Sequence, residues 1–449
     1  MIYDVVVVGS GFSAIAVVCN LVRKLPQTAS IAVIGDDPGF GRGTAYRTEM
    51  HLHRLNVPAA RMSLFTDRPA DFVEWLSRKN RPSRDADFAS RSDYGLYVRD
   101  TLADLLRYRD DRCRVDFIKA KATGCVERYP DALGFLLEHG GEIAGRRVVL
   151  CLGLGNAKLP VDTGVLGSVM RSYVIENPWR LSWLTHVGPQ DRVCILGSGL
   201  TMIDQVLGLR SHGHRGRIDV LSRRGLAPHG HVRDPKSPAA IEIDANGTTL
   251  SQILHDIRRR VRSEADWRSV MDGLRPKTQA IWQNLAPAER SRFLRHAMPW
   301  WNVHRHRVAP DIYDRFEQLR QQGVVNFHAG YLKTLKDAGD GIGIEYRKRG
   351  RRETIALTVD WIVNCTGMER AGLAHSPLLQ EMRRQGFVAA DSLGLGISVD
   401  RDSRVLNSEG VTQSNLYAVG ALTAGQFWEI TAVPDIRAQA EQVAAQIAM

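Results

Sequence analysis

The feature that most constrains the fold of this chain is a short apolar strand that runs directly into a glycine-rich turn and a helix. The β-branched run 2–8 leads into Gly9-Ser10-Gly11-Phe12-Ser13-Ala14, and a second apolar run follows at 30–34. This GxGxxA pattern in a βαβ context is typical of a dinucleotide-binding unit. Gly9 allows the tight turn, and Gly11 lets the backbone approach a pyrophosphate at the helix N-terminus.

The same arrangement occurs a second time. The run 192–196 leads into Gly197-Ser198-Gly199-Leu200-Thr201-Met202, where Met202 replaces the third small residue. The following strand, at 217–222, ends on Arg223-Arg224 rather than on an acid. A 2′-phosphate requires a guanidinium where a bare ribose requires a carboxylate, so this ending predicts NADPH rather than NADH. The alternative is that both arginines are solvated surface residues.

In the first unit the second strand ends on Gly35, and Asp36 and Asp37 follow. We expect Asp36 rather than Asp37 to meet a ribose hydroxyl pair, unless the glycine displaces this contact or the turn is only solvated. The dense glycines of 39–46 indicate backbone held against a flat ligand, and a plain surface loop is the alternative.

Length and composition place bounds on the function. A chain of 449 residues with 44% hydrophobic and 24% charged residues predicts at least two globular lobes. The net charge of +11 is dispersed, which favours anionic small ligands over nucleic acid. The six cysteines form no CxxC pair, and no signal peptide or long apolar run is present. We therefore expect buried thiols, a cytoplasmic location and no membrane insertion.

Further along the chain, strand-like runs at 147–152 and 360–365 end in glycine turns, and a last strand at 415–419 precedes a closing helix. With these elements the chain resembles the bacterial FAD/NAD(P)-binding protein family, which are FAD-dependent oxidoreductases with two Rossmann-type sites. The resemblance covers nearly the whole chain. The blocks that carry it are Gly41-Arg-Gly-Thr-Ala-Tyr46, Leu55-Asn-Val-Pro58, Ser222-Arg-Arg-Gly225, Trp300-Trp-Asn-Val-His-Arg-His-Arg307 and Trp428-Glu-Ile-Thr-Ala-Val-Pro434.

The resemblance implies an α/β fold with two Rossmann-like dinucleotide-binding domains. The FAD-binding domain would be discontinuous, from 1–160 and 325–449, and the NADPH-binding domain would cover 161–324. A helical insertion rich in Trp and Arg is expected at about 250–310.

More distantly, the chain is similar to class B flavin monooxygenases. Its run Asp360-x-x-x-x-Cys365-Thr366-Gly367 is similar to an element of N-hydroxylating amine monooxygenases. The Phe-x-Gly-x-x-x-His signature of Baeyer–Villiger enzymes is absent, so ketone oxygenation is less favoured. Ala421 follows Gly420 where many FAD folds have an aspartate, so that contact with FAD would be made differently, through the backbone.

Two sets of cofactor-binding residues follow from the motifs and the resemblance. For FAD they are Gly9, Gly11, Phe12, Ser13, Ala14, Asp36, Asp37, Gly43, Ala45, Tyr46, Asn56, Met62, Gly153, Gly367, Gly420 and Trp428. For NADPH they are Gly197, Gly199, Leu200, Thr201, Arg223 and Arg224.

The segment 267–307 combines tryptophans, histidines and arginines. This pairing suits a nicotinamide pocket or a carboxylate substrate, and a packed helical subdomain is the alternative. His304 and His306 would share one face of a strand, but no third ligand is evident and we predict no metal site. The candidates for catalysis are Glu429, Arg305 and His304, with capping of the last helix as the alternative role of Glu429.

These features predict an oxidoreductase that uses FAD and NADPH. The leading hypothesis is a monooxygenase in which reduced flavin takes up dioxygen as a C4a-(hydro)peroxyflavin and hydroxylates the nitrogen of a small, anionic or amino-acid substrate. The closest alternative is an NADPH:acceptor reductase without oxygen insertion. A more remote alternative is a non-catalytic nucleotide-binding protein.

Overall fold

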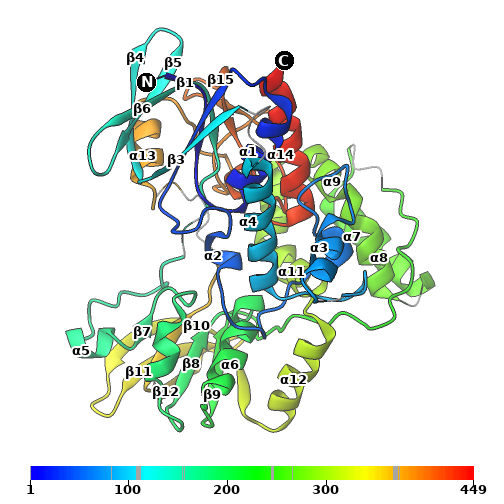
Figure 1. The fold of residues 1–449 in the computed structure, drawn as a ribbon. Coiled ribbons are helices and arrows are strands. Elements are labelled where there is room, and N and C mark those ends of the chain that lie inside the picture. Colours follow the sequence, from blue (N-terminus) through cyan, green and yellow to red (C-terminus); the bar gives the residue numbers. More distant parts are fainter. Residues whose placement is uncertain are drawn as a thin grey trace.

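The computed structural model describes residues 2–81, 83–107, 113–153, 155, 157–243, 247–264, 266–367, 373 and 375–449. Two sheets occupy the upper and lower parts of the view in Figure 1, and a group of helices lies at the right. The expected α/β fold with two Rossmann-like domains and a helical insertion is confirmed.

The first domain is built on a sheet of strand order β14-β15-β6-β1-β2-β3. Its strands are β1 (Ile2–Val8), β2 (Ser30–Gly35), β3 (Arg114–Lys119), β6 (Glu142–Leu150), β14 (Arg404–Leu406) and β15 (Thr412–Ala418). From β15 to β3 all neighbours are parallel, and the hairpin of β4 (Ala122–Tyr129) and β5 (Ala132–Leu137) adds to β6 in antiparallel fashion. Because β15 pairs with β6, segments from both ends of the chain complete one sheet, and the domain is discontinuous as expected.

Helices cover both faces of this sheet. The helices of the first domain are α1 (Phe12–Lys24), α2 (Gly43–Tyr46), α3 (Asp71–Arg78), α4 (Arg91–Arg107), α13 (Pro377–Arg384) and α14 (Val433–Ala448), with the short turns η1 (Ala59–Arg61) and η6 (Ala421–Thr423). Helix α1 packs against α14 and α4, which explains why nearly its whole length is buried. An all-round apolar helix of this kind is stabilised by its neighbours rather than by an amphipathic pattern.

The second domain has a sheet of order β12-β11-β10-β9-β8-β13-β7. Its strands are β7 (Val174–Ile175), β8 (Val193–Leu196), β9 (Ile218–Ser222), β10 (Val325–Asp337), β11 (Ile342–Lys348), β12 (Thr354–Val359) and β13 (Trp361–Asn364). Its helices are α5 (Ser168–Arg171), η2 (Leu181–His186), α6 (Leu200–Ser211) and α12 (Pro310–Gln321). The five strands from β10 to β7 are parallel, and β10 to β12 form an antiparallel meander at one edge.

The expected domain boundary at residue 325 is wrong. Strand β10 begins there, but it pairs in parallel with β9, and β13 pairs with β8. The second domain therefore extends to the glycine turn at Gly367, and the first domain resumes beyond it. Strand pairing over more than a hundred residues decides this boundary, and the local sequence of β10 carries no sign of it.

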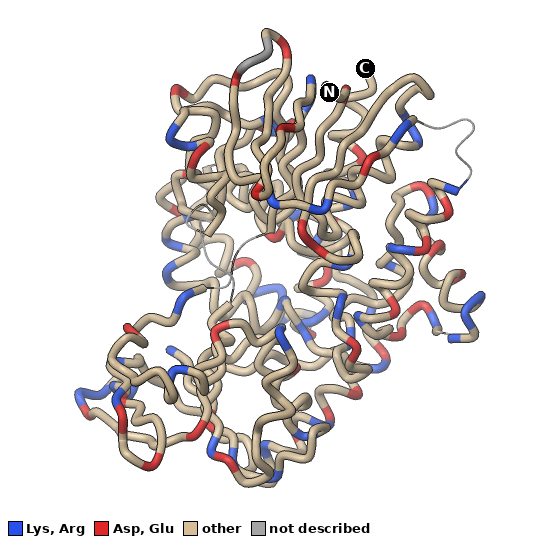
Figure 2. The backbone as a smooth tube through the Cα atoms, turned by 60° about the vertical axis from the view of Figure 1, so that its left-hand side comes forward, with Lys and Arg blue, Asp and Glu red and all other residues tan. Residues whose placement is uncertain are grey.

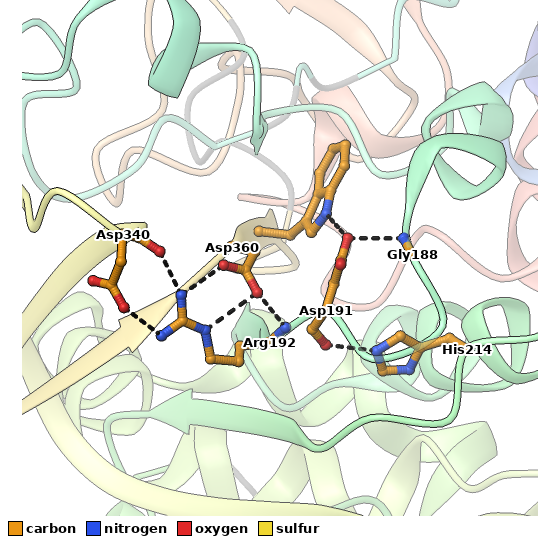
Figure 3. A network of polar contacts seen from close by, with 7 residues as sticks. Gly188, Asp191, Arg192, His214, Asp340 and Asp360 are labelled. Atoms are coloured by element: carbon orange, nitrogen blue, oxygen red, sulfur yellow. Dashed lines mark hydrogen bonds and ion pairs between the residues drawn. The ribbon is translucent and has the colours of Figure 1, made fainter.

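A polar network ties β13 to the start of β8 (Figure 3). The Asp360 carboxylate accepts hydrogen bonds from the Arg192 guanidinium and from the Arg192 backbone N–H, both at 2.7 Å. The arginine holds the pKa of Asp360 below its usual value. The neighbouring Asp191 accepts from the Trp361 indole at 2.8 Å. Asp360 thus has a structural role, although its run is similar to an element of amine monooxygenases.

The insertion at 250–305 is helical, as expected. It consists of α7 (Leu250–Glu264), α8 (Trp267–Leu274), η3 (Arg275–Lys277), α9 (Thr278–Asn284), α10 (Pro287–Arg292), the π-helical turn η4 (Phe293–Ala297) and α11 (Met298–Arg305). His304 lies on α11 and His306 just beyond its end, so these histidines do not share a strand.

Charge and hydrophobicity complete the description. Basic and acidic residues are interspersed along the backbone of both domains (Figure 2). Among the described residues, no helix is both long and apolar enough to cross a bilayer.

Candidate functional site

The first cradle lies where β1 meets α1. Gly9 has φ of +137°, and a methyl group there would lie 2.5 Å from the Cys151 carbonyl oxygen. Gly11 begins α1 without any side-chain cap, so the first N–H groups of the helix remain available. The loop 39–46 lies across this end, because the Gly41 N–H donates to the Ser10 carbonyl at 2.7 Å. A methyl group at Gly43 would come within 3.2 Å of the Gly11 Cα atom.

The open space around this cradle fits a bound FAD. A methyl group at Gly153 would meet no described atom within 4 Å, and α1 has no acidic residue in its first turn. The Trp428 indole nitrogen is buried and has no hydrogen-bond partner among the described residues. A helix N-terminus attracts a pyrophosphate, and a buried donor requires an acceptor, so the residues present suit the dinucleotide.

The two aspartates after β2 lie beside this cradle without converging on it. Asp36 is exposed, with its carboxylate 3.4 Å from the Lys121 ammonium. The Asp37 carboxylate accepts from the Gly39 N–H at 3.2 Å and closes the turn. Gly35 packs on Ser10, where a methyl group would lie 2.4 Å from the Ser10 Cβ. Contact of either acid with a ribose stays a prediction.

Other residues predicted for this site occupy different depths. Met62 is only 2% exposed and belongs to the core of the first domain. Tyr46 lies in an aromatic group with its ring 4.8 Å from Tyr94, and burial raises its pKa to about 12. Gly420 is packed on Ser13, but its N–H already donates to the Gln439 side chain at 2.8 Å. That backbone donor is therefore not free for a ligand.

One prediction for FAD is wrong in its placement: Gly367 follows β13 of the second sheet and lies with the second cradle. Phe12, Ser13 and Ala14 form the first turn of α1, and Ala45 is exposed on α2. The Asn56 carbonyl accepts from the His231 ring nitrogen at 3.2 Å, across the domain junction.

The second cradle repeats the geometry of the first. Gly197 has φ of +100°, and a methyl group there would lie 2.1 Å from the Cys365 carbonyl oxygen. Gly199 begins α6 without a side-chain cap, and Leu200 and Thr201 form the first turn. Methyl groups at Gly199 and Gly367 would meet no described atom within 4 Å. This free volume at a helix N-terminus fits a second pyrophosphate.

Arginines surround the end of β9. Arg223 is exposed and Arg224 half-buried, and neither guanidinium bonds to another described side chain. Arg349 donates to the Arg223 carbonyl at 3.2 Å, and Arg347 lies over the Tyr331 ring at 5.1 Å. Sequence reasoning missed Arg349, because only the pairing of β9, β10 and β11 brings it to this point.

A third group of residues joins the insertion to the turn before α14. Glu429 has φ of +64°, and its side chain is 7% exposed. Its carboxylate accepts from the Trp301 indole at 2.6 Å and from Arg305 Nε at 3.0 Å, and His306 Nε2 lies 3.5 Å away. No side chain caps α14, so the capping role considered for Glu429 is wrong.

Positive charge accumulates around this carboxylate. Burial, reinforced by Arg305, lowers the pKa of Arg275 to about 10, and its Nη2 atom is buried without a hydrogen-bond partner. Arg61 adds to the positive field and Asp435 opposes it. Burial raises the pKa of Asp435, which weakens that opposition. A buried guanidinium with an unsatisfied N–H is suited to receive an anion.

The structure brings together two of the three predicted catalytic residues. Glu429 and Arg305 are in contact, whereas His304 packs its ring on Trp267 and His229, each at 4.9 Å, and bonds to the Trp300 carbonyl. The histidine beside Glu429 is His306, and burial lowers its pKa. The part of the chain that is described holds no group of three His, Cys, Asp or Glu side chains placed to bind a metal.

The fold and the two cradles define a class of architecture, a pair of Rossmann-type dinucleotide-binding domains. Residues 6–155 match the model of the FAD-NAD(P)-binding family, so the first domain is an FAD-NAD(P)-binding domain. This confirms the resemblance inferred from the glycine motifs. No curated protein matches the chain.

Several solved structures share the fold over almost the entire chain. An ornithine N-hydroxylase from Kutzneria sp. 744, solved with reduced FAD, NADP⁺ and L-ornithine, has a TM-score of 0.69 at 15% identity, covering 100% of this chain and 99% of that one. An L-lysine 6-monooxygenase from Pseudomonas syringae has a TM-score of 0.67 at 18% identity, covering 99% of both. A bacillithiol disulfide reductase from Bacillus cereus has a TM-score of 0.57 at 14% identity, covering 100% of this chain and 99% of that one.

Proposed function

We propose that this protein is an FAD-dependent, NADPH-using monooxygenase that hydroxylates the nitrogen of a small amine or amino acid in the cytoplasm. The observation that carries the proposal is the buried, positively charged group around Glu429, the residue that follows Trp428, for which contact with FAD is predicted. Two solved structures of similar fold act on ornithine and lysine, both amino acids with a side-chain amine.

When bound, FAD would supply the redox chemistry, which is reduction by NADPH followed by activation of dioxygen. The chain supplies the binding groups. Gly11 and Gly43 would hold the FAD pyrophosphate, while Gly199 and Arg224 would hold NADPH. The unsatisfied Nη2 of Arg275 would receive a substrate carboxylate.

Glu429 would act as a positioning residue in this arrangement. Its two carboxylate oxygens bond to Trp301 and Arg305, so it fixes both side chains in the wall of the site. A charged residue that is already paired on both oxygens is better suited to orient neighbours than to exchange a proton with substrate.

The test is to supply the FAD-loaded protein with NADPH, isotopically labelled dioxygen and a panel of amines with and without carboxylates. We expect labelled oxygen in the hydroxylated product, with one NADPH consumed for each product molecule. Arg275→Gln should lower kcat/KM about tenfold for amino acids and leave plain diamines unaffected. Arg295→Gln, an exposed arginine in the same insertion, is the matched control. Oxidation of NADPH that yields one hydrogen peroxide from dioxygen per NADPH, with every amine, would contradict the proposal.

The second candidate is an NADPH:acceptor reductase, a function compatible with the fold shared with a disulfide reductase. A dithiol mechanism has little support, because all six cysteines are buried outside any disulfide, and burial raises the pKa of Cys19 and Cys125 to about 12. Rapid anaerobic reduction of a quinone or dye, without labelled oxygen in any amine, would favour this candidate. A non-catalytic nucleotide-binding protein would show neither activity.

A further inference from the structure

The helical insertion contains a large cavity that the proposed reaction does not use. It has a volume of about 930 Å³ and lies between α7, α8, η4 and α11. Ligand pockets for small molecules usually measure about 300 to 1,000 Å³, so this cavity has room for a ligand much larger than an amino acid. Its walls include Trp267, Met271, Phe293 and Trp300.

Helix α7 supplies an apolar stripe along one side of the cavity. Leu250, Leu254, Ile257 and Val261 recur every three or four residues, which places them on one face of the helix. Leu254, Ile257 and Val261 are half-buried, because they pack against the core of the insertion on one side and line the cavity on the other. On the opposite side, Trp300 is 50% exposed. A concave, mostly apolar lining of this kind is typical of a small-molecule site.

Two arginines of the same helix border this stripe. Arg258 and Arg262 line the cavity, and no hydrogen bond or ion pair joins either guanidinium to another described residue. Their neighbour Arg259 lies outside the cavity and is paired with Asp256 at 2.8 Å. Free guanidinium groups beside an apolar wall match a ligand that carries an anionic head on a hydrocarbon body.

The cavity adjoins the candidate active site without being part of it. Trp301 lines the cavity, and its indole donates to Glu429 at 2.6 Å. Phe293, another wall residue, packs edge-on against Trp428 at 5.5 Å. Phe293 is the first residue of the π-helical turn η4, and Trp301 lies on α11, which follows that turn. Irregular turns of this kind are frequent at functional sites.

We propose that this cavity is a second ligand site, which binds an amphipathic carboxylate of the fatty-acid type. The hydrocarbon chain lies along Leu254, Ile257 and Val261 and against the tryptophans. The carboxylate is bound by Arg258 and Arg262. The inference does not depend on the reaction proposed above, because binding is measured without turnover.

The test is calorimetric titration of the FAD-loaded protein with dodecanoate and with dodecanol, below the concentrations at which they aggregate. We expect saturable binding of one dodecanoate per chain, with tighter binding of the acid than of the alcohol. The double variant Arg258→Gln/Arg262→Gln should weaken dodecanoate binding about tenfold and leave dodecanol binding unchanged. Arg259→Gln, which removes one positive charge from the same helix outside the cavity, should bind both as the original chain does.

A second variant tests the apolar wall. Ile257→Trp adds a large side chain on the cavity face, and it should weaken dodecanoate and dodecanol alike. Circular dichroism and FAD content establish that each variant is folded. Absence of saturable binding, equal losses in the Arg259→Gln variant, or binding of an amphipathic peptide helix in place of dodecanoate would overturn the proposal.

Discussion

At the scale of single residues, two glycines of one motif differ in what a methyl group would meet. Gly197 has a left-handed φ, and a methyl group there would lie 2.1 Å from the Cys365 carbonyl oxygen, so only glycine is tolerated. Gly199 has nothing within 4 Å on the corresponding side. Gly197 is therefore required for the backbone conformation and packing of the turn. Gly199 leaves space that a ligand can occupy.

This difference allows a sharp test of the second cradle. Gly199→Ala should leave FAD content and the unfolding midpoint unchanged, while KM for NADPH rises about tenfold, because the methyl group takes the place of the pyrophosphate. Steady-state kinetics measures the effect. Gly167→Ala, at an equally open but exposed position, should change nothing. An unchanged KM in the Gly199→Ala variant would show that NADPH binds elsewhere.

Glu429 is the second residue whose removal has a defined consequence. Glu429→Ala leaves Arg305 buried without its carboxylate, and such a loss costs about 3 kcal/mol of unfolding free energy. Urea denaturation of the FAD-loaded protein measures this change. Glu409→Ala, at an exposed turn, serves as the control and should be neutral. Equal stability of the two variants would mean that the carboxylate is not holding the insertion in place.

His231 makes stability depend on pH. Burial, together with the nearby Arg307, lowers its pKa to about 3, whereas the unfolded chain takes up this proton near the usual value of 6.5. Between these values the unfolded state binds more protons, so stability falls as the pH falls. We expect His231→Gln to lose less stability than the original chain between about pH 7 and about pH 5. His255→Gln, which replaces an exposed histidine, should show the same pH dependence of stability as the original chain. The same pH dependence in His231→Gln would mean that the His231 ring is not buried in solution.

At the scale of elements, a buried ion pair between two helices links the two domains. Arg91 on α4 lies 3.0 Å from Asp204 on α6, with side chains 13% and 7% exposed. The His53 ring reaches the Asp204 carbonyl at 3.3 Å, and Trp179 lies beneath the Arg91 guanidinium. These contacts join α4 of the first domain to α6 of the second.

Breaking this pair should loosen the domains. Arg91→Ala leaves Asp204 buried and unpaired, and we expect a loss of about 3 kcal/mol and faster limited proteolysis between the domains. Arg84→Ala, whose ion pair with Asp87 is exposed, should be nearly neutral. A single sharp unfolding transition with unchanged midpoint in Arg91→Ala would show that packing alone holds the junction.

The elements that could be predicted from sequence are those whose determinants are local. Both cradles follow from a strand, two glycines and a helix within about thirty residues, and both are present. The meander β10 to β12 was assigned to the wrong domain, because its partner β9 lies a hundred residues earlier. Similarly, the sequence indicates Glu429 and Arg305 as candidates, but their contact depends on packing between segments 124 residues apart. The same packing places His306, rather than the predicted His304, beside Glu429. Arg349 was missed for the same reason.

At the scale of the whole molecule, the first domain depends on its last helix. Helix α14 packs along α1, and Gln439 within it holds the Gly420 turn through its side chain. A chain that stops at residue 432 should therefore fail to retain FAD, as judged by flavin absorbance after gel filtration. Gln442→Ala, on the same helix with only an exposed partner, should retain it. Retention of FAD by the shortened chain would show that α1 is stabilised without α14.

The discontinuous first domain also has a consequence for protein synthesis. Strands β1 to β3 leave the ribosome early, but their neighbours β15 and α14 are among the last segments made. The inserted second domain is fully synthesised by residue 367 and can fold before β15 and α14 of the first domain have been made. Throughout elongation the apolar helix α1 lacks its neighbour α14. The side of α1 that α14 covers in the folded protein is therefore open to chaperones until translation is nearly finished.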